Sequence, residues 1–174
     1  MKIDGDTPLT EKIQAKKKNY YTDLQELGNI SIPRKVQPAV NKTTEVHGFC
    51  NASIEAYGAC IYVRSLNHQG EWHARLLCSK SRVALLKGAT IPRLELRGAL
   101  LLTQLAEKVA QSWNLKIEKF SFWSDSTILL GRLRSQASWL KVFVTNRVCQ
   151  ILESTNVHQW KHVKGEEIPA VTMD

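Results

Sequence analysis

Residues 46–53 read Val-His-Gly-Phe-Cys-Asn-Ala-Ser, a short apolar run that ends in a small polar turn. The run predicts a strand, and two more strand-like runs follow it, YGACIYVRSL and EWHARLLCS. Polar turn residues separate the three runs, and strands that are joined by short turns pair in antiparallel order. Residues 45–78 therefore predict a three-stranded antiparallel meander.

Strands and helices alternate after this meander. Pro92 suits a first helical turn, and the leucines that follow it recur at helical spacing as far as Trp113. KIEKFSFWSD then indicates a strand, STILLGRLRS a short helix with Asp125 or Ser126 as its N-cap, SWLKVFVTNRVCQILEST an amphipathic helix, and VHQWKHV a last strand. This order predicts a mixed α/β fold, in which strand-helix-strand crossovers bring the later strands in parallel.

The N-terminal part differs from this pattern. Apolar residues recur at helical spacing over residues 9–27, and Gly28 is a typical stop signal. The following segment contains two prolines and predicts a connector with one short strand around residues 30–32. We therefore expect a helix and linker over residues 1–44 and the main domain over residues 45–174.

Composition indicates an ordinary globular protein, because 43% of the 174 residues are hydrophobic and 23% are charged. No apolar run approaches the length of a membrane span, and the N-terminus does not resemble a signal peptide. We expect an intracellular protein, cytoplasmic or nuclear, that has no membrane partner. The four cysteines are irregularly spaced and lack the pattern of a structural zinc site, so we expect free thiols.

Positive charge predominates and is unevenly distributed. The net charge is +8, which favours polyanionic partners. Six basic residues and one acid lie between Arg75 and Arg97, and four basic residues and no acid lie between Arg132 and Arg147. Such stretches indicate a phosphate-facing surface. A solvated face that only keeps the protein soluble explains them equally well.

Two carboxylates occupy positions that suit chemistry. Asp125 ends a predicted strand, and Glu95 lies in the first turn of the predicted helix that starts near Pro92. In open α/β sheets, sites gather at the carboxyl ends of strands. Each residue also has a plain structural interpretation, with Asp125 as a helix cap and Glu95 as a favourable charge near a helix N-terminus.

Six segments carry a resemblance to a known family. In order and spacing, the chain resembles the ribonuclease H region of Bel/Pao-type retrotransposon polyproteins, and the upstream LQELGNISIPR resembles the end of the segment that links polymerase to ribonuclease H. The six segments are HGFCNASIEAYGACIYVRS, LLCSKSRVA, IPRLELRGALL, FWSDSTILLGRL, WLKVFVTNRVCQILE and HVKGEEIPA. A collinear match of this kind is much more specific than a single motif.

The resemblance implies a ribonuclease H fold, with a mixed five-stranded sheet flanked by helices. The implied activity is hydrolysis of the RNA strand of an RNA–DNA hybrid by two magnesium ions that four carboxylates hold. Magnesium is a hard cation that binds oxygen, and two such ions need negative charge around them while they activate water and stabilise the leaving oxygen. The implied partners are RNA–DNA hybrid or other nucleic acid and the remainder of a retrotransposon polyprotein.

Two of the four acids are replaced when the family pattern is carried over to this chain. The first acid falls at Asn51, the second matches Glu95, the third matches Asp125, and the fourth falls at Val171. Arg132 is a further departure, because the family tends to have Trp at that position. The resemblance therefore indicates a degenerate copy.

The expected consequence is little or no ribonuclease activity. At an effective dielectric of about 20, each lost charge near a divalent ion forgoes on the order of several kcal/mol. Asp174 lies three residues after Val171 in a terminal tail, where we do not expect it to replace the lost acid. Nucleic-acid binding is the function that we expect to survive, through four basic or hydroxyl residues: Ser53, Lys80, Arg82 and Ser126.

Other functions compete with this one. A retroviral-type aspartic peptidase needs an Asp-Thr/Ser-Gly loop, and Asp125-Ser126-Thr127 lacks the glycine. Two alternatives to an active or impaired nuclease remain open, a non-catalytic nucleic-acid-binding module and an inert structural remnant of a transposon polyprotein.

Overall fold

A computed structural model of the chain describes four stretches, residues 10–29, 44–66, 69–84 and 90–169. The chain separates into two compact units, residues 1–35 and residues 36–174. The strand expected around residues 30–32 lies outside the described residues. The expected domain division at residue 45 follows residues 30–43, which are not described, and it stays a prediction.

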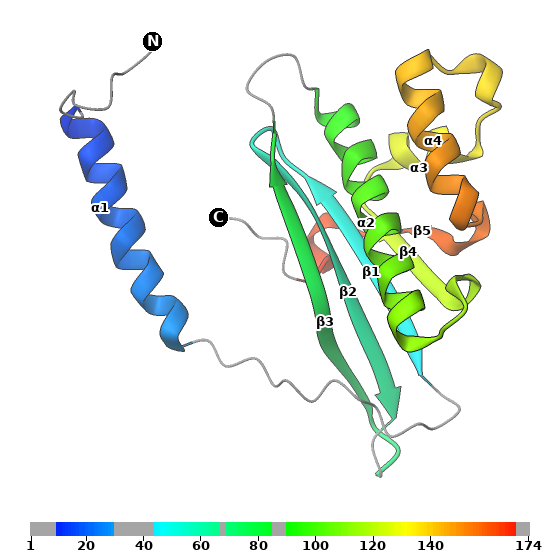
Figure 1. Ribbon diagram of the computed structural model, residues 1–174, viewed down its shortest axis with the longest axis horizontal. Coiled ribbons are helices and arrows are strands. Elements are labelled where there is room, and N and C mark those ends of the chain that lie inside the picture. Colours follow the sequence, from blue (N-terminus) through cyan, green and yellow to red (C-terminus); the bar gives the residue numbers. More distant parts are fainter. Residues whose placement is uncertain (1–9, 30–43, 67–68, 85–89, 170–174) are drawn as a thin grey trace. The chain divides into compact units, whose positions relative to one another are not determined.

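The first unit contains one described helix. Helix α1 spans Glu11–Glu26 and continues into a short 3-10 turn, η1, at Leu27–Asn29 (Figure 1). The helix predicted over residues 9–27 is therefore present. Every described residue of α1 is exposed to solvent, including its apolar side chains Ile13, Tyr20 and Leu24.

The second unit is built on a mixed sheet of five strands in the order β3-β2-β1-β4-β5 (Figure 1). β1 pairs antiparallel with β2, and β2 pairs antiparallel with β3, so the predicted meander is confirmed. β4 pairs parallel with both β1 and β5, as the crossovers predict. The strands are β1 Glu45–Ala52, β2 Ala56–Leu66, β3 Trp72–Val83, β4 Phe120–Ser124 and β5 Trp160–His162.

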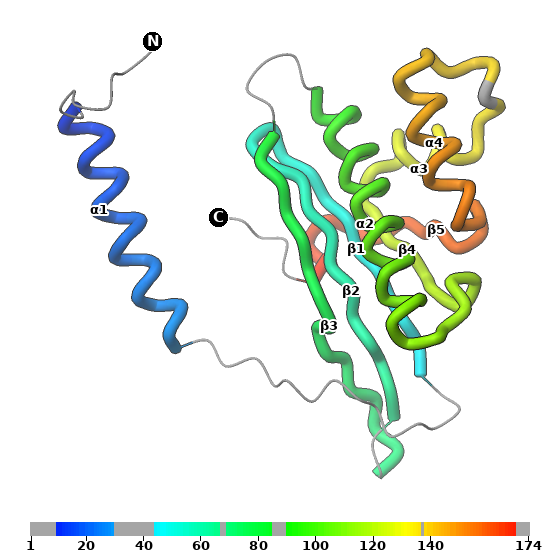
Figure 2. The backbone as a smooth tube through the Cα atoms, in the orientation of Figure 1, coloured from blue at the N-terminus to red at the C-terminus, as the bar shows by residue number. Residues whose placement is uncertain are grey.

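Two helices lie on this sheet, and a third packs against both of them. α2, Ile91–Trp113, contacts β1, β2 and the neighbouring helix α4, Val142–Ser154, and the short α3, Thr127–Arg134, contacts β4 and β5 (Figure 2). No described helix has the length and apolar character that crossing a lipid bilayer requires. The type and order of these helices agree with the prediction from the sequence.

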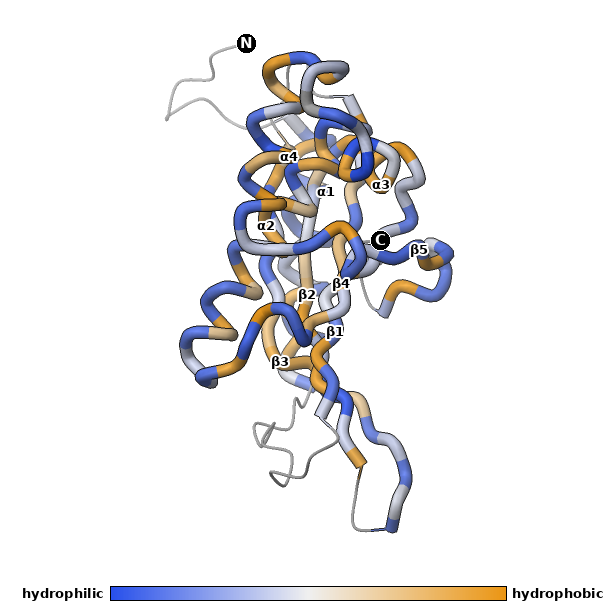
Figure 3. The backbone as a smooth tube through the Cα atoms, turned by 90° about the vertical axis from the view of Figure 1, so that its right-hand side faces the viewer, coloured by the Kyte–Doolittle hydropathy of each residue, from blue (hydrophilic) through white to orange (hydrophobic). Residues whose placement is uncertain are grey.

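The core fills the space between the sheet and the helices. In Figure 3, hydrophobic and hydrophilic residues alternate along α2 and α4, as expected for helices that bury one side. Gly48 of β1 allows α2 to approach closely, because a Cβ atom there would lie only 2.7 Å from Leu102 Cδ1. The most deeply buried large side chains come from both layers: Ile61, Leu94, Leu96, Leu102, Phe120, Phe122, Leu129, Ile151 and Trp160.

Candidate functional site

The candidate site lies where the carboxyl ends of β1 and β4 meet the beginning of α2. β1 and β4 are parallel neighbours, so their carboxyl ends lie at the same edge of the sheet. Asn51 is the penultimate residue of β1, and Asp125 directly follows β4. Gly98 brings α2 against this edge, because a Cβ atom there would lie 3.3 Å from the Asn51 carbonyl oxygen and 3.7 Å from Cys50 Cβ.

Glu95 and Ser126 are joined by a short hydrogen bond. Ser126 Oγ donates to Glu95 Oε2 at 2.6 Å and accepts the Leu129 backbone N–H at 3.0 Å. Ser126 is therefore the N-cap of α3, one of the two residues that the sequence allowed. Glu95 is the fifth residue of α2, which begins at Ile91, so its expected position in the first turn is wrong by one residue.

Asp125 does not cap a helix, because Ser126 has that role. Its side chain is half-buried beside Gly165, where a Cβ atom would lie 3.2 Å from Asp125 Oδ2. A glycine at 165 leaves room for the carboxylate against the segment that follows β5. The plain interpretation of Asp125 as a cap is thus wrong.

Asn51 uses its amide oxygen locally. Its Oδ1 accepts the backbone N–H of Ala52 at 2.7 Å. One of the two lone pairs of this amide oxygen is therefore used within the strand end. A carboxylate in its place would carry a negative charge and further acceptor capacity.

The buried thiol of Cys50 is close enough to Glu95 and Asp125 for their charges to affect its pKa. Burial, together with the negative charges of Asp125 and Glu95, raises the pKa of the Cys50 thiol to about 12. Both carboxylates therefore lie within electrostatic reach of one buried thiol. The sequence predicts only that Cys50 is a free thiol, and this is confirmed. The one feature of the sequence that indicates its burial is its position in an alternating strand.

The described residues do not fit a pair of magnesium ions. They contain no group of three His, Cys, Asp or Glu side chains that could hold one metal ion. Glu95 Oε2 accepts from Ser126 and Asn51 Oδ1 accepts from Ala52, so each of these two potential ligand oxygens already has one hydrogen-bond donor. Val171 and Asp174 lie outside the described residues.

Of the four residues expected to bind nucleic acid, Ser126 contacts Glu95, and the other three have different surroundings. The Ser53 hydroxyl accepts the backbone N–H groups of Glu55 and Ala56, so it holds the turn between β1 and β2. Lys80 and Arg82 are exposed on β3, the edge strand, opposite Ala59 and Tyr57 of β2. Their role in binding stays a prediction.

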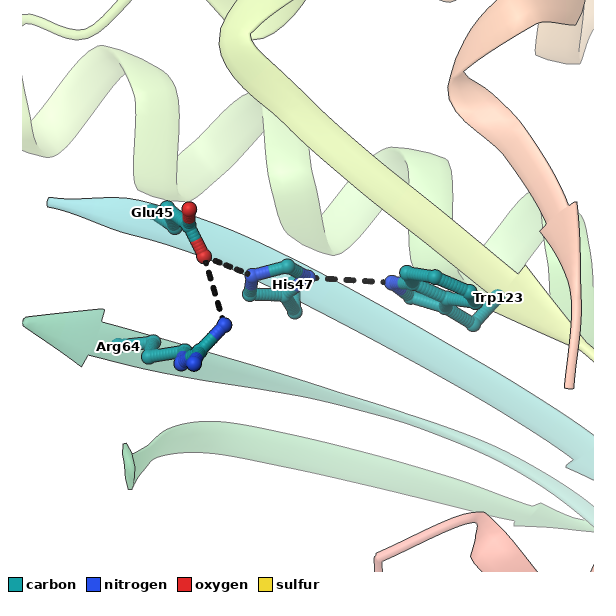
Figure 4. Close-up of polar contacts among 4 residues, drawn as sticks. All are labelled: Glu45, His47, Arg64 and Trp123. Atoms are coloured by element: carbon teal, nitrogen blue, oxygen red, sulfur yellow. Dashed lines mark hydrogen bonds and ion pairs between the residues drawn. The ribbon is translucent and has the colours of Figure 1, made fainter. Parts of the chain in front are cut away.

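A second polar cluster lies at the other end of β1 (Figure 4). Trp123 Nε1 donates to His47 Nδ1 at 3.1 Å, so the ring proton of neutral His47 is on Nε2, which donates to Glu45 Oε2 at 3.0 Å. This hydrogen bond lowers the pKa of Glu45, and the Arg64 charge adds to the effect. Asn51 lies six positions after Glu45, about 20 Å along a strand, so Glu45 and its neighbour Arg64 are no part of the candidate site.

Comparison with known proteins agrees with this architecture. A family model described as the Pao retrotransposon-like RNaseH-like domain matches residues 1–126. No curated protein matches the chain. The fold of ribonuclease H1 from Halobacterium salinarum is similar at 13% identity and a TM-score of 0.42, over 70% of this chain and 87% of that one.

A viral protein is also similar in structure. The foamy viral protease-reverse transcriptase in complex with dsDNA is 13% identical, with a TM-score of 0.48, over 87% of this chain and 29% of that one. The family match covers more than half of this chain and includes Asn51, Glu95 and Asp125. The chain therefore belongs to the Pao retrotransposon-like, ribonuclease H-like domain family.

Proposed function

We propose that this ribonuclease H-like domain binds RNA–DNA hybrids and has little or no hydrolytic activity of its own. Family members are expected to hydrolyse the RNA strand of such hybrids with magnesium. The observation that carries the proposal is the state of Asn51, which has no charge and whose Oδ1 is bound to its neighbour's backbone. The retained pair, Glu95 and Asp125, supplies two negative charges against the four positive charges of two magnesium ions.

Binding of a hybrid does not require the complete set of metal ligands that hydrolysis requires. Hybrids are recognised by shape, by the 2′-hydroxyl and by phosphate contacts, none of which requires a complete set of metal ligands. The net charge of +8 supports a polyanionic partner. Affinity is therefore expected to depend on salt and to tolerate many sequences.

A cleavage assay tests the first half of the proposal. A labelled RNA–DNA hybrid is incubated with the full chain in magnesium or manganese, beside the variant Glu95→Gln. We expect no cleavage above the level of this variant. Cleavage by the unaltered chain that Glu95→Gln abolishes overturns the proposal.

A reversion series tests its physical cause. Asn51→Asp together with Val171→Asp restores both missing charges, and we expect measurable cleavage from the double variant and little from either single one. Full recovery from one change alone would show that the charges do not combine as proposed.

Hybrid binding separates the proposal from the inert remnant. Affinity is measured for the full chain at low and at moderate salt. We expect binding that weakens as salt rises. Absence of salt-sensitive binding leaves only the structural remnant.

A further inference from the structure

Three arginines surround one aromatic ring on the helical side of the fold. The ring belongs to Phe143 at the start of α4 and is partly exposed. Three guanidinium Cζ atoms lie within 6.0 Å of its centroid, those of Arg147 at 3.9 Å, Arg93 at 5.0 Å and Arg97 at 6.0 Å. Two helices supply these side chains, Arg93 and Arg97 from α2 and Arg147 from α4.

A fourth arginine joins this group from α3. Arg132 Nη1 donates to the Pro92 carbonyl oxygen at 2.7 Å, next to Arg93 in the chain. Arginines from the two basic stretches, far apart along the chain, thus meet at one place. We call Arg93, Arg97, Arg132 and Arg147 the arginine cluster.

Acidic side chains do not neutralise the arginine cluster. The salt bridges within the described residues involve His47, Arg64 and His73 as the basic partners. No Asp or Glu lies between Asp125 and Glu153, the stretch that contains α3 and most of α4. Like charges held this close repel one another, so an anion that bound between them would relieve the repulsion.

The geometry suits phosphate better than a point anion. A guanidinium carries five N–H donors along its planar edges, of which Arg147 uses one on the Phe143 carbonyl oxygen and Arg132 uses one on the Pro92 carbonyl oxygen. Such edges match the oxygens of a phosphate group. Arg93 and Arg97 are one helical turn apart, about 6 Å, so they present their donors as a row rather than as a single site.

The arginine cluster adjoins the candidate site but is separate from it. Glu95 lies between Arg93 and Arg97 in α2, and its Oε2 accepts from Ser126, the N-cap of α3. A nucleic acid that reached this edge of the sheet would pass the beginnings of α2 and α4. The cluster is therefore placed to hold a backbone that leads to or from the site.

We propose that the arginine cluster is a phosphate-backbone site, which Phe143 preorganises and which holds one strand of a bound nucleic-acid duplex. The inference rests on the proposed function, because it names the surface that binds the duplex. Replacement of the ancestral metal ligands leaves this surface intact. Such a site reads no bases, so binding through it is independent of sequence.

The test compares two variants that lose the same charge. The triple variant Arg93→Ala, Arg97→Ala and Arg147→Ala removes three cluster residues, and the matched control removes three exposed lysines, Lys108, Lys116 and Lys119, at the other end of α2 and beyond it. Affinity for an RNA–DNA hybrid is measured over a salt series. Each lost phosphate contact lowers the slope of log K against log salt by about one unit.

We expect the cluster variant to bind at least about tenfold more weakly and to lose about two to three units of slope, while the lysine control stays close to the unaltered chain. Equal losses in both variants, or none in the cluster variant, overturn the inference and leave the proposed function standing. Absence of salt-sensitive binding in the unaltered chain overturns the proposed function instead. If the triple variant fails to fold, the single reversals Arg93→Glu and Lys108→Glu, both at exposed positions, give the same comparison.

Discussion

At the residue scale, Ser126 has two structural roles in one hydroxyl group. It accepts the Leu129 N–H at the start of α3 and donates to Glu95 Oε2, and the side chain is almost fully buried. Its family-like position suggested a contact with phosphate or sugar. In this structure the hydroxyl serves the helix and the carboxylate, so a substrate that used it would have to compete with both.

Ser126→Ala is expected to lower the free energy of unfolding by about 1–2 kcal/mol. Loss of an N-cap costs about 1 kcal/mol, and the Glu95 carboxylate loses a donor that it does not recover in a partly buried place. Urea unfolding measures the change, with the exposed Ser138→Ala as the control. Equal stability of the two variants would contradict the hydrogen-bond geometry at the site.

Cys50 gives the fold a specific weakness in alkali. Burial raises the pKa of its thiol from 9.0 to about 12, so the unfolded chain loses this proton at lower pH than the folded chain. Stability is therefore full below pH 9 and falls as pH rises from 9 towards 12, by about 1.4 kcal/mol per pH unit for one thiol. Cys60, with its pKa raised to about 11 by burial, adds to the same loss.

Cys50→Ala isolates this contribution. We expect its unfolding free energy to fall less steeply between pH 9 and 11 than that of the unaltered chain, although its stability at pH 7 is lower. Cys149→Ala, at an exposed position, is expected to keep the original slope. Urea unfolding under reducing conditions at a series of pH values provides the measurement, and identical slopes for all three proteins would show that Cys50 is not the cause.

At the element scale, the sequence predicts which segments are helices and strands better than where they begin. α4 begins at Val142 rather than at Ser138, because the Trp139 segment forms a separate 3-10 turn and Lys141 is extended. Likewise, β5 begins only at Trp160, because Asn156 caps a 3-10 turn with its side chain. Such local side-chain bonds compete with regular structure and leave no trace in hydrophobic periodicity.

Two helical glycines are expected to respond differently to the same substitution. Gly131 of α3 is exposed and has open space where an added methyl group would lie, so Gly131→Ala should stabilise the fold by about 0.5–1 kcal/mol. Gly98 of α2 faces the Asn51 carbonyl oxygen, which would lie 3.3 Å from an added Cβ atom, and backbone cannot move aside as a flexible side chain can. We expect Gly98→Ala to forfeit this gain, so the unfolding free energies of the two variants should differ by about 0.5–1 kcal/mol. A similar gain in both variants would mean that α2 does not press on β1.

At the scale of the whole molecule, the sequence predicts the sheet and its order of elements because alternating runs, helical spacing and turns are local signals. It also places Glu95, Asp125 and Asn51 at one edge, since strand ends and a helix start meet there. The arginine cluster cannot be predicted from such local signals, because Arg93 and Arg147 come together only when α2 and α4 pack against each other. The engagement of Asn51 Oδ1 by Ala52 is equally invisible, since it depends on one side-chain rotamer.

The two compact units are expected to differ in whether they fold alone. Among the described residues, the whole hydrophobic core lies in the second unit and no residue of α1 is buried. A chain of residues 36–174 should therefore have a melting temperature within a few degrees of that of the full chain. It keeps the described core residues, whose burial stabilises the fold. A peptide of residues 1–35 should show little helix in water, since an isolated helix of 16 residues is marginal. Circular dichroism of both pieces and of the full chain measures this, and a large drop in the melting temperature of the shortened chain would show that residues 1–35 contribute to the fold.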